Sequence, residues 1–136
     1  MPEIESIKKD YETVKQKTAH YDEYKVNQST DVILMSVYPG DTGQAALTEV
    51  FLEGNKILEK HPGSIEDFEL GTNKSLRGKF VDVYTLVTDV QQDSDLTSFL
   101  FELFGGDKPY EYYTEKTVHS NGDSVIYKIT IFFTIH

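Results

Sequence analysis

Hydrophobic positions at the start of the chain recur at helical spacing. Between residues 4 and 21 the repeating positions are separated alternately by three and four residues, with charged residues between them. They are Ile4, Ile7, Tyr11, Val14, Thr18 and Tyr21. This spacing places a narrow stripe on one side of an α-helix, so the sequence predicts an amphipathic helix within residues 1–28. A narrow stripe suits docking on the rest of the domain, or pairing with another chain as in a heptad seam.

From about residue 30 the pattern changes to short runs of β-branched and aromatic residues. Turn-forming residues separate the runs, which is typical of strands in a sheet. The runs lie at 31–38, 46–53, 65–70, 79–90, 110–118 and 124–135, with a short continuation at 57–58. The run 79–90 is apolar on both faces, which predicts a central strand. The Asn121-Gly122 pair between the last two runs predicts a β-hairpin.

The segment 96–104 fits two structures. Its apolar positions match a helix that begins after Asp95 and ends at Gly105. They also match a strand with Phe99 and Leu103 on one face. We favour the strand, because a segment that is densely apolar and aromatic on all sides and lies between two convincing strands suits a buried sheet.

These patterns together predict a mainly β fold. We expect an antiparallel β-sandwich, or a small barrel, of six to seven strands with one N-terminal amphipathic helix. The length of 136 residues fits a single domain, in which 1–28 form the helix and 30–136 form the body. The longest apolar runs are far shorter than the roughly 20 residues that a membrane-spanning helix needs.

The charge and the cysteine content exclude several classes of function. The formal charge is −10, from 23 acidic and 13 basic residues. Such a surface repels phosphate backbones, so we expect no nucleic-acid partner. The chain has no cysteine, which excludes disulfides, thiolate metal sites and cysteine nucleophiles. The first residues are charged and lack an apolar signal region, which predicts a cytoplasmic protein if Met1 is the native start.

No catalytic motif is present in the sequence, which favours a non-enzymatic protein. The histidines are isolated from one another in the sequence, at His20, His61, His119 and His136. His119, Ser120 and Asp123 have the composition of a catalytic triad, but neighbours in a tight turn point in different directions. Nearby carboxylates also occur, at Glu66, Asp67 and Glu69 and at Glu111 and Glu115. In a chain this acidic we interpret their proximity as chance.

One acidic constellation predicts a metal site. Asp89, Asp93 and Asp95 lie in and beside a loop between two predicted strands. Carboxylate oxygens clustered on a loop are the ligands that Ca²⁺ requires. A β-sandwich that carries Asp-x-Asp in an end loop resembles the C2 domains, and the resemblance implies calcium binding followed by lipid binding. The alternative is that these acids only form turns, with Asp95 as a cap.

Three functional hypotheses follow. The first is a non-enzymatic binding or assembly module that acts through a protein partner or self-association. It rests on the helical stripe, on the tyrosine-rich run at 110–113 and on an edge strand open to β-augmentation. The second is a calcium-dependent C2-like module that uses the Asp89–Asp95 loop. The third is a small-ligand carrier or small enzyme with a barrel pocket.

Overall fold

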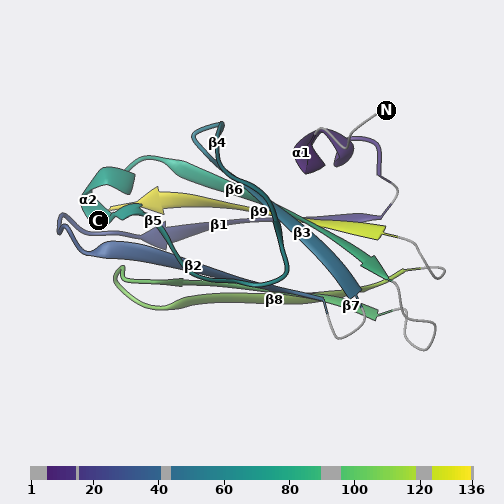
Figure 1. The fold of residues 1–136 in the computed structure, drawn as a ribbon. Helices are drawn as coiled ribbons and strands as arrows, with labels where there is room; N and C mark the ends of the chain where they lie inside the picture. Colours follow the sequence, from purple (N-terminus) through teal and green to yellow (C-terminus); the bar gives the residue numbers. More distant parts are fainter. Residues whose placement is uncertain (1–5, 15, 41–43, 90–95, 119–123, 136) are drawn as a thin grey trace.

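The computed structural model is a sandwich of two β-sheets (Figure 1). It describes residues 6–14, 16–40, 44–89, 96–118 and 124–135. The five-stranded sheet has the order β1-β9-β6-β3-β4, and the four-stranded sheet has the order β5-β2-β7-β8. The strands are β1 (Lys17–Lys25), β2 (Val32–Pro39), β3 (Gln44–Leu52), β4 (Asn55–Pro62), β5 (Ile65–Thr72), β6 (Phe80–Asp89), β7 (Leu96–Phe104), β8 (Tyr110–Thr117) and β9 (Ser124–Thr134). Two short helices, α1 (Ile7–Asp10) and α2 (Asn73–Leu76), complete the described elements.

The predicted fold class is confirmed, with nine strands where we expected six to seven. Among the described strands all pairs are antiparallel except β1 with β9, which is parallel. The prediction of a central strand at 79–90 is confirmed, because β6 lies between β9 and β3. Its residues Val81, Val83 and Val87 are fully buried between the sheets. The strand interpretation of 96–104 is also confirmed, and this segment is β7.

The predicted N-terminal helix over residues 1–28 is wrong in its extent. The helix is limited to Ile7–Asp10, and Lys17–Lys25 form strand β1 at the edge of the five-stranded sheet. The side chain of Tyr24 packs in the core while that of Tyr21 is exposed on the other face. Residues three positions apart lie on one side of a helix but on opposite sides of a strand. The segment forms a strand because it pairs with β9.

The predicted hairpin between the last two strands is also wrong. Both strands form near the expected positions, but β8 pairs with β7 and β9 pairs with β1 and β6. The chain therefore crosses from one sheet to the other between residues 118 and 124. The Asn121-Gly122 pair lies outside the described residues. A turn sequence signals a reversal of the chain, and it does not specify whether the next strand joins the same sheet.

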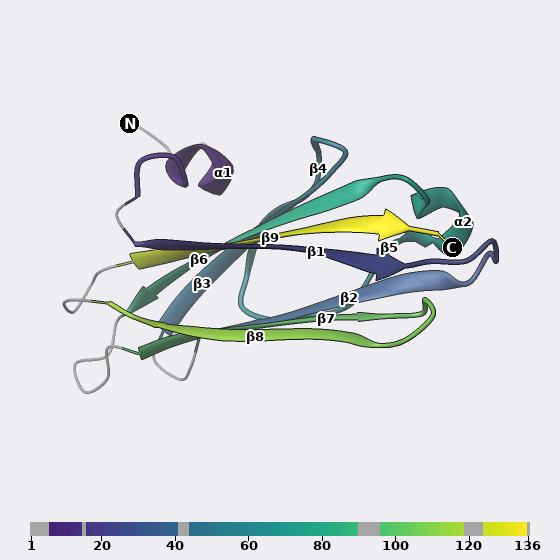
Figure 2. The same cartoon turned by 180° about the vertical axis from the view of Figure 1, so that it is seen from behind.

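The N-terminal segment packs on the outward side of the five-stranded sheet (Figures 1 and 2). Ile7 is fully buried there in a small second core with Phe51, Tyr84 and Ile126. Glu49 on β3 is also fully buried on this side. Its Oε1 atom accepts hydrogen bonds from the Ser6 hydroxyl at 3.0 Å, the Ile7 N–H at 2.8 Å and the Lys8 N–H at 3.2 Å.

Neither described helix covers the outward side of the four-stranded sheet. Helix α1 lies on the other side of the molecule from β8 in both views (Figures 1 and 2). Helix α2 follows β5 and inserts Leu76 into the core. Among the described residues no helix covers the outward face of β5, β2, β7 and β8, and the outward side chains of β8 are exposed.

Candidate functional site

The outward face of the four-stranded sheet carries an excess of acidic side chains, and we call it the acidic face. On β5, Ile65, Phe68 and Leu70 point into the core, so the carboxylates between them point outward. On β8 the same alternation turns Tyr110 and Tyr112 inward. The carboxylates of the acidic face are Glu66, Asp67, Glu69, Glu102, Glu111 and Glu115.

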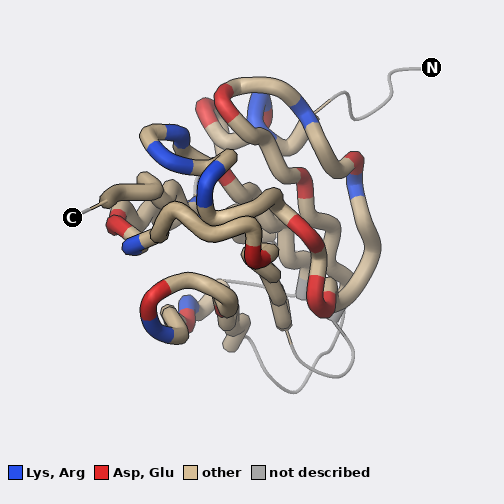
Figure 3. The backbone as a smooth tube through the Cα atoms, turned by 90° about the vertical axis from the view of Figure 1, so that its left-hand side faces the viewer, with Lys and Arg blue, Asp and Glu red and all other residues tan. Residues whose placement is uncertain are grey.

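The four strands contain one basic residue, Lys116, and it does not lie on the acidic face. Lys116 follows Glu115 along β8 and faces the buried Thr97 of β7, so it belongs to the inward side. Figure 3 shows the sandwich nearly end-on, with acidic positions in red and basic positions in blue along the backbone. Within these four strands, acidic side chains on the outward side have no basic neighbour on the same face.

Several of these carboxylates form a band across the sheet. Glu102 lies directly opposite Glu111 in the β7–β8 pair and opposite Ser36 in the β2–β7 pair. Ser36 in turn faces a β-bulge of β5, where its hydroxyl accepts a hydrogen bond from the Asp67 N–H at 3.1 Å. Like charges directly opposite each other in a sheet are destabilising, so the Glu102–Glu111 pair lowers the stability of the isolated domain.

Large apolar side chains are exposed around this band. The exposed fraction is 38% for Phe104 and 53% for Tyr113. Tyr113 lies opposite Leu100 of β7, which in turn lies opposite Tyr38 of β2, so an apolar row crosses the sheet beside the acidic band. Aromatic residues are enriched in the contact surfaces of proteins, and charges of one sign attract a surface of the opposite sign.

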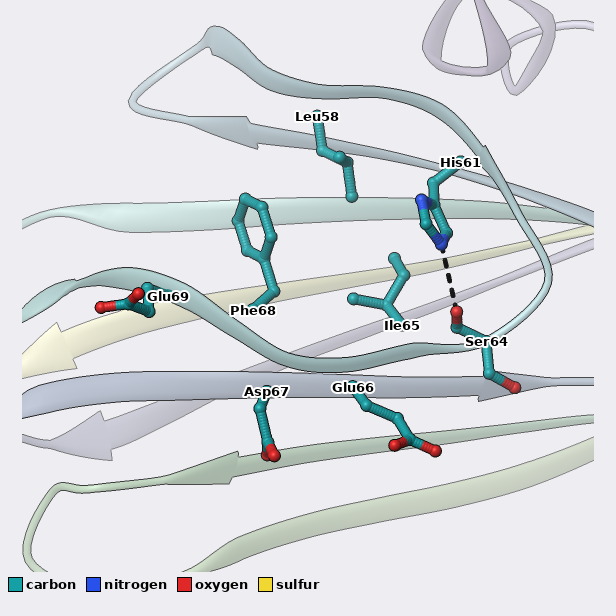
Figure 4. Close-up of a pocket in the computed structure, with 8 residues that line it drawn as sticks. All are labelled: Leu58, His61, Ser64, Ile65, Glu66, Asp67, Phe68 and Glu69. Atoms are coloured by element: carbon teal, nitrogen blue, oxygen red, sulfur yellow. Dashed lines mark hydrogen bonds between the residues drawn. The ribbon is translucent and has the colours of Figure 1, made fainter.

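A groove borders the acidic face at strand β5 (Figure 4). It has a volume of about 720 Å³ and lies between β4 and β5. Leu58, Ile65 and Phe68 form its apolar part, and the Glu66 and Asp67 side chains point away from them (Figure 4). The His61 Nε2 atom lies 3.1 Å from the Ser64 carbonyl oxygen, so this histidine is engaged in the β4–β5 turn. The groove therefore offers apolar contact area beside the acidic face.

The opposite face of the sandwich differs in its charge pattern. On the five-stranded sheet the Lys128 ammonium group lies 5.3–5.7 Å from the ring centroids of Tyr11, Tyr21 and Tyr84. It also donates a hydrogen bond to the Tyr21 hydroxyl at 3.2 Å. Cation–π contacts of this kind satisfy the charge within the domain. This face therefore supplies its own cation, whereas the acidic face does not.

A cluster of titratable side chains joins β1 to β8 where the edges of the two sheets meet. The Tyr110 hydroxyl donates to the Asp22 Oδ2 atom at 2.8 Å and lies 3.2 Å from the His20 Nε2 atom. The His20 ring stacks on the Tyr112 ring, with 3.9 Å between centroids. These groups bind one another across the seam, which suits a latch between the two edge strands.

The electrostatics of this cluster agree with a structural role. Burial raises the pKa of the Tyr110 hydroxyl, and the hydrogen bond to Asp22 raises it further. Burial also works to raise the pKa of the Asp22 carboxyl, but hydrogen bonds from the Glu23 N–H and from Tyr110 hold that pKa below its usual value. The tyrosine therefore stays a donor and the aspartate stays an ionised acceptor over a wide range of pH.

The predicted calcium ligands are only partly within the described residues. Asp89 is the last residue of β6, while Asp93 and Asp95 lie outside the described residues. The described residues contain no group of three or more His, Asp or Glu side chains arranged to hold a metal ion. Calcium binding by the Asp89–Asp95 loop stays a prediction. The three residues with the composition of a catalytic triad, His119, Ser120 and Asp123, also lie outside the described residues.

Sequence reasoning noted the carboxylates of β5 and β8 but interpreted them as chance neighbours. It missed that the two groups share one face with Glu102. The signal was available in the alternation of runs 65–70 and 110–118, but it required knowing that both runs belong to the same sheet. The described part of the chain contains no helix long and apolar enough to cross a membrane. The cytoplasmic location stays a prediction.

Comparisons of the chain with protein-family models, with curated proteins and with solved structures find no match.

Proposed function

We propose that this protein is a non-enzymatic binding module that docks a cationic protein partner on the acidic face. The observation that carries the proposal is the segregation of six carboxylates, without a basic neighbour on that face, among the exposed rings of Phe104 and Tyr113. A positively charged surface would neutralise this field, and the aromatic side chains would supply the apolar contact area.

The geometry supports a protein partner better than a metal ion. Neighbouring strands are about 4.8 Å apart, and the band runs over four strands, so its carboxylates are distributed over a surface rather than gathered at a point. The direct opposition of Glu102 and Glu111 costs stability in the free domain. A partner that brings basic side chains between them would relieve this repulsion on binding.

The test compares two variants that lose the same charge on different faces. Glu102→Gln with Glu111→Gln removes two charges from the acidic band, and Glu23→Gln with Glu59→Gln removes two exposed charges from the five-stranded sheet. Each immobilised protein is exposed to cell extract of the source organism at low salt, and a retained partner is purified for titration. We expect the acidic-band variant to bind this partner about tenfold more weakly than wild type, and the control variant to bind as wild type does.

The acidic-band variant should fold at least as well as wild type, since it removes a like-charge pair. A thermal melt of both variants checks this point, so weaker binding cannot be attributed to unfolding. The affinity should also fall steeply as salt is added. A partner that binds both variants equally, or a failure of wild type to retain any cationic protein, would contradict the proposal.

A further inference from the structure

The sandwich has four edge strands, and they differ in how well their edges are protected. The edges are β1 and β4 in the five-stranded sheet and β5 and β8 in the four-stranded sheet. An edge strand is a template for pairing with another chain unless bulges, charges or covering groups prevent it. An added strand would therefore fit best on the edge that has the fewest of these protections.

Three of the edges are interrupted by bulges or have backbone carbonyl groups that already accept hydrogen bonds. The pairing of β4 with β3 and of β5 with β2 is shifted by bulges, and Asp67 in β5 has a positive φ of 52°. Strand β1 is regular, but its carbonyl groups are engaged near both ends. The Thr18 carbonyl accepts a hydrogen bond from the Tyr11 hydroxyl at 3.0 Å, and the Lys25 carbonyl accepts one from the Asp107 N–H at 3.2 Å.

Strand β8 is the regular edge. It pairs with β7 without a register shift from Tyr110 to Thr117, and β7 is its one strand neighbour in the described sheet. Its side chains alternate strictly between partly buried and exposed, so the strand is straight enough to accept a further strand in register. The exposed side chains of this edge are Glu111, Tyr113, Glu115 and Thr117.

We propose that the partner binds as an added strand on β8, and that this strand carries two basic residues four positions apart with an apolar residue midway. This inference rests on the proposed function and specifies the partner at the same site. On the acidic face, residues of an added strand would lie beside Glu111, Tyr113 and Glu115. Basic side chains complement the two carboxylates, and an apolar side chain complements the tyrosine ring.

The intervening residues of the added strand would point to the other face, beside Tyr112 and Thr114. Tyr112 is already stacked on His20 at that seam, so small β-branched residues suit these positions. The resulting pattern is Lys-Thr-Val-Thr-Lys. A second copy of this chain fits poorly, because antiparallel pairing of β8 with β8 about Tyr113 would place Glu111 opposite Glu115.

The test uses a labelled synthetic peptide with this five-residue core and two isomers of it that differ only in backbone N-methylation. One isomer is methylated at the Val and the second Lys, and the other at the two Thr residues. Alternate N–H groups of an extended strand point to opposite edges, so one isomer loses its hydrogen bonds to β8 and the other keeps them. We expect one isomer to bind about tenfold more weakly than the parent peptide and the other to bind nearly as the parent does.

Each further outcome decides the inference. Equal binding by the parent and both isomers would overturn strand addition while leaving cationic docking on the acidic face intact. Absence of binding by the parent peptide, or unchanged binding by the Glu111→Gln, Glu115→Gln variant, would overturn the inference. Sedimentation equilibrium tests for a homodimer. A homodimer would overturn the inference in favour of self-pairing if it is stronger in the Glu111→Gln, Glu115→Gln variant and if the peptide does not dissociate it.

Discussion

Glu49 shows how one buried charge fixes the path of the N-terminal segment. Its Oε1 atom accepts three hydrogen bonds from residues 6–8, and its Oε2 atom lies 3.4 Å from the Lys56 ammonium group. The carboxylate therefore takes the place of a side-chain N-cap for α1, because Ser6 forms no capping hydrogen bond within its own helix. A helix this short depends on such a contact with the sheet.

Replacement of Glu49 by alanine should release the N-terminal segment and destabilise the fold. The Ile7 and Lys8 N–H groups would lose their acceptor and Lys56 would lose its counter-charge, so we expect a loss of about 3 kcal/mol in the free energy of unfolding. Glu49→Gln keeps an acceptor oxygen and should cost about 1 kcal/mol. Urea titration measures the stability, and limited proteolysis within residues 6–16 measures release of the segment.

Glu59→Gln on the neighbouring strand β4 is the matched control, because its side chain is exposed. We expect a change within about 0.5 kcal/mol and no added cleavage. Equal effects of Glu49→Ala and Glu59→Gln would refute the role of Glu49. Sequence analysis could not identify this residue, since an acid within an apolar run indicates a strand end or an exposed face unless its partner is known.

At the scale of elements, the local sequence predicted most strands. The prediction failed for β1, whose structure depends on a contact with a segment distant in the sequence. The runs that became β2, β6, β7 and β9 are rich in β-branched or aromatic residues. Strand β1 has three such residues among nine, at a spacing that also fits a helix, and its pairing with β9, more than 100 residues later, provides its partner. Lys17–Lys25 therefore belong to the body of the domain, and their removal would delete an edge strand.

The seam between β1 and β8 predicts a pH-dependent contribution at the scale of these two elements. Tyr110→Phe removes the hydroxyl that bonds Asp22 and His20, and it should cost no more than about 1 kcal/mol at neutral pH, since Asp22 is half exposed. The pKa of Asp22 is lowered in the fold, so its contribution is present above its ordinary value of 3.8 and is lost as pH falls through the lowered value. Urea titrations at neutral pH and below pH 3.8 should therefore show the difference between wild type and variant shrinking at the lower pH.

Tyr113→Phe tests whether any hydroxyl on β8 would have the same effect. Its hydroxyl bonds Glu115 at 3.0 Å on the exposed side of the same strand. We expect a smaller loss than for Tyr110→Phe at neutral pH, because this hydrogen bond is exposed to solvent. If the two variants behave alike at both pH values, the seam does not latch β1 to β8.

At the scale of the whole molecule, the sequence predicts the sign of the net charge but not its location. The charge of −10 is a sum over the chain, whereas the acidic face arises because β5, β7 and β8 join one sheet with a common outward side. The wrong hairpin prediction for β8 and β9 would have placed Glu111 and Glu115 in the sheet that contains Lys128. The candidate site thus depends on sheet assignment, which is a long-range property that local patterns do not encode.

The tyrosines of the interior predict how the whole fold responds to alkaline pH. Burial raises the pKa of the Tyr127 hydroxyl to about 12, although a hydrogen bond with Thr97 works in the opposite direction. A folded-state pKa above the ordinary value of 10.0 means that the contribution of Tyr127 is complete below pH 10.0 and is lost as pH rises through about 12. Tyr11, Tyr24, Tyr84 and Tyr110 have pKa values shifted in the same direction, and burial is the main cause for each.

We therefore expect the free energy of unfolding to fall above pH 10.0, with Tyr127 contributing about 1.4 kcal/mol per pH unit up to about pH 12, as measured by urea titration at stepped pH. Tyr127→Phe should reduce this slope by about one proton, because the variant has no hydroxyl to keep protonated in the core. At neutral pH it should cost only about 1 kcal/mol, since the Thr97 hydroxyl keeps its bond to the Lys116 carbonyl at 2.7 Å. Tyr21→Phe alters a side chain that is 58% exposed and is the control for loss of a surface hydroxyl. Identical slopes for wild type and Tyr127→Phe would mean that the Tyr127 hydroxyl ionises as readily in the folded domain as in the unfolded chain. The packing between the two sheets would then be looser than the full burial of the Tyr127 side chain indicates.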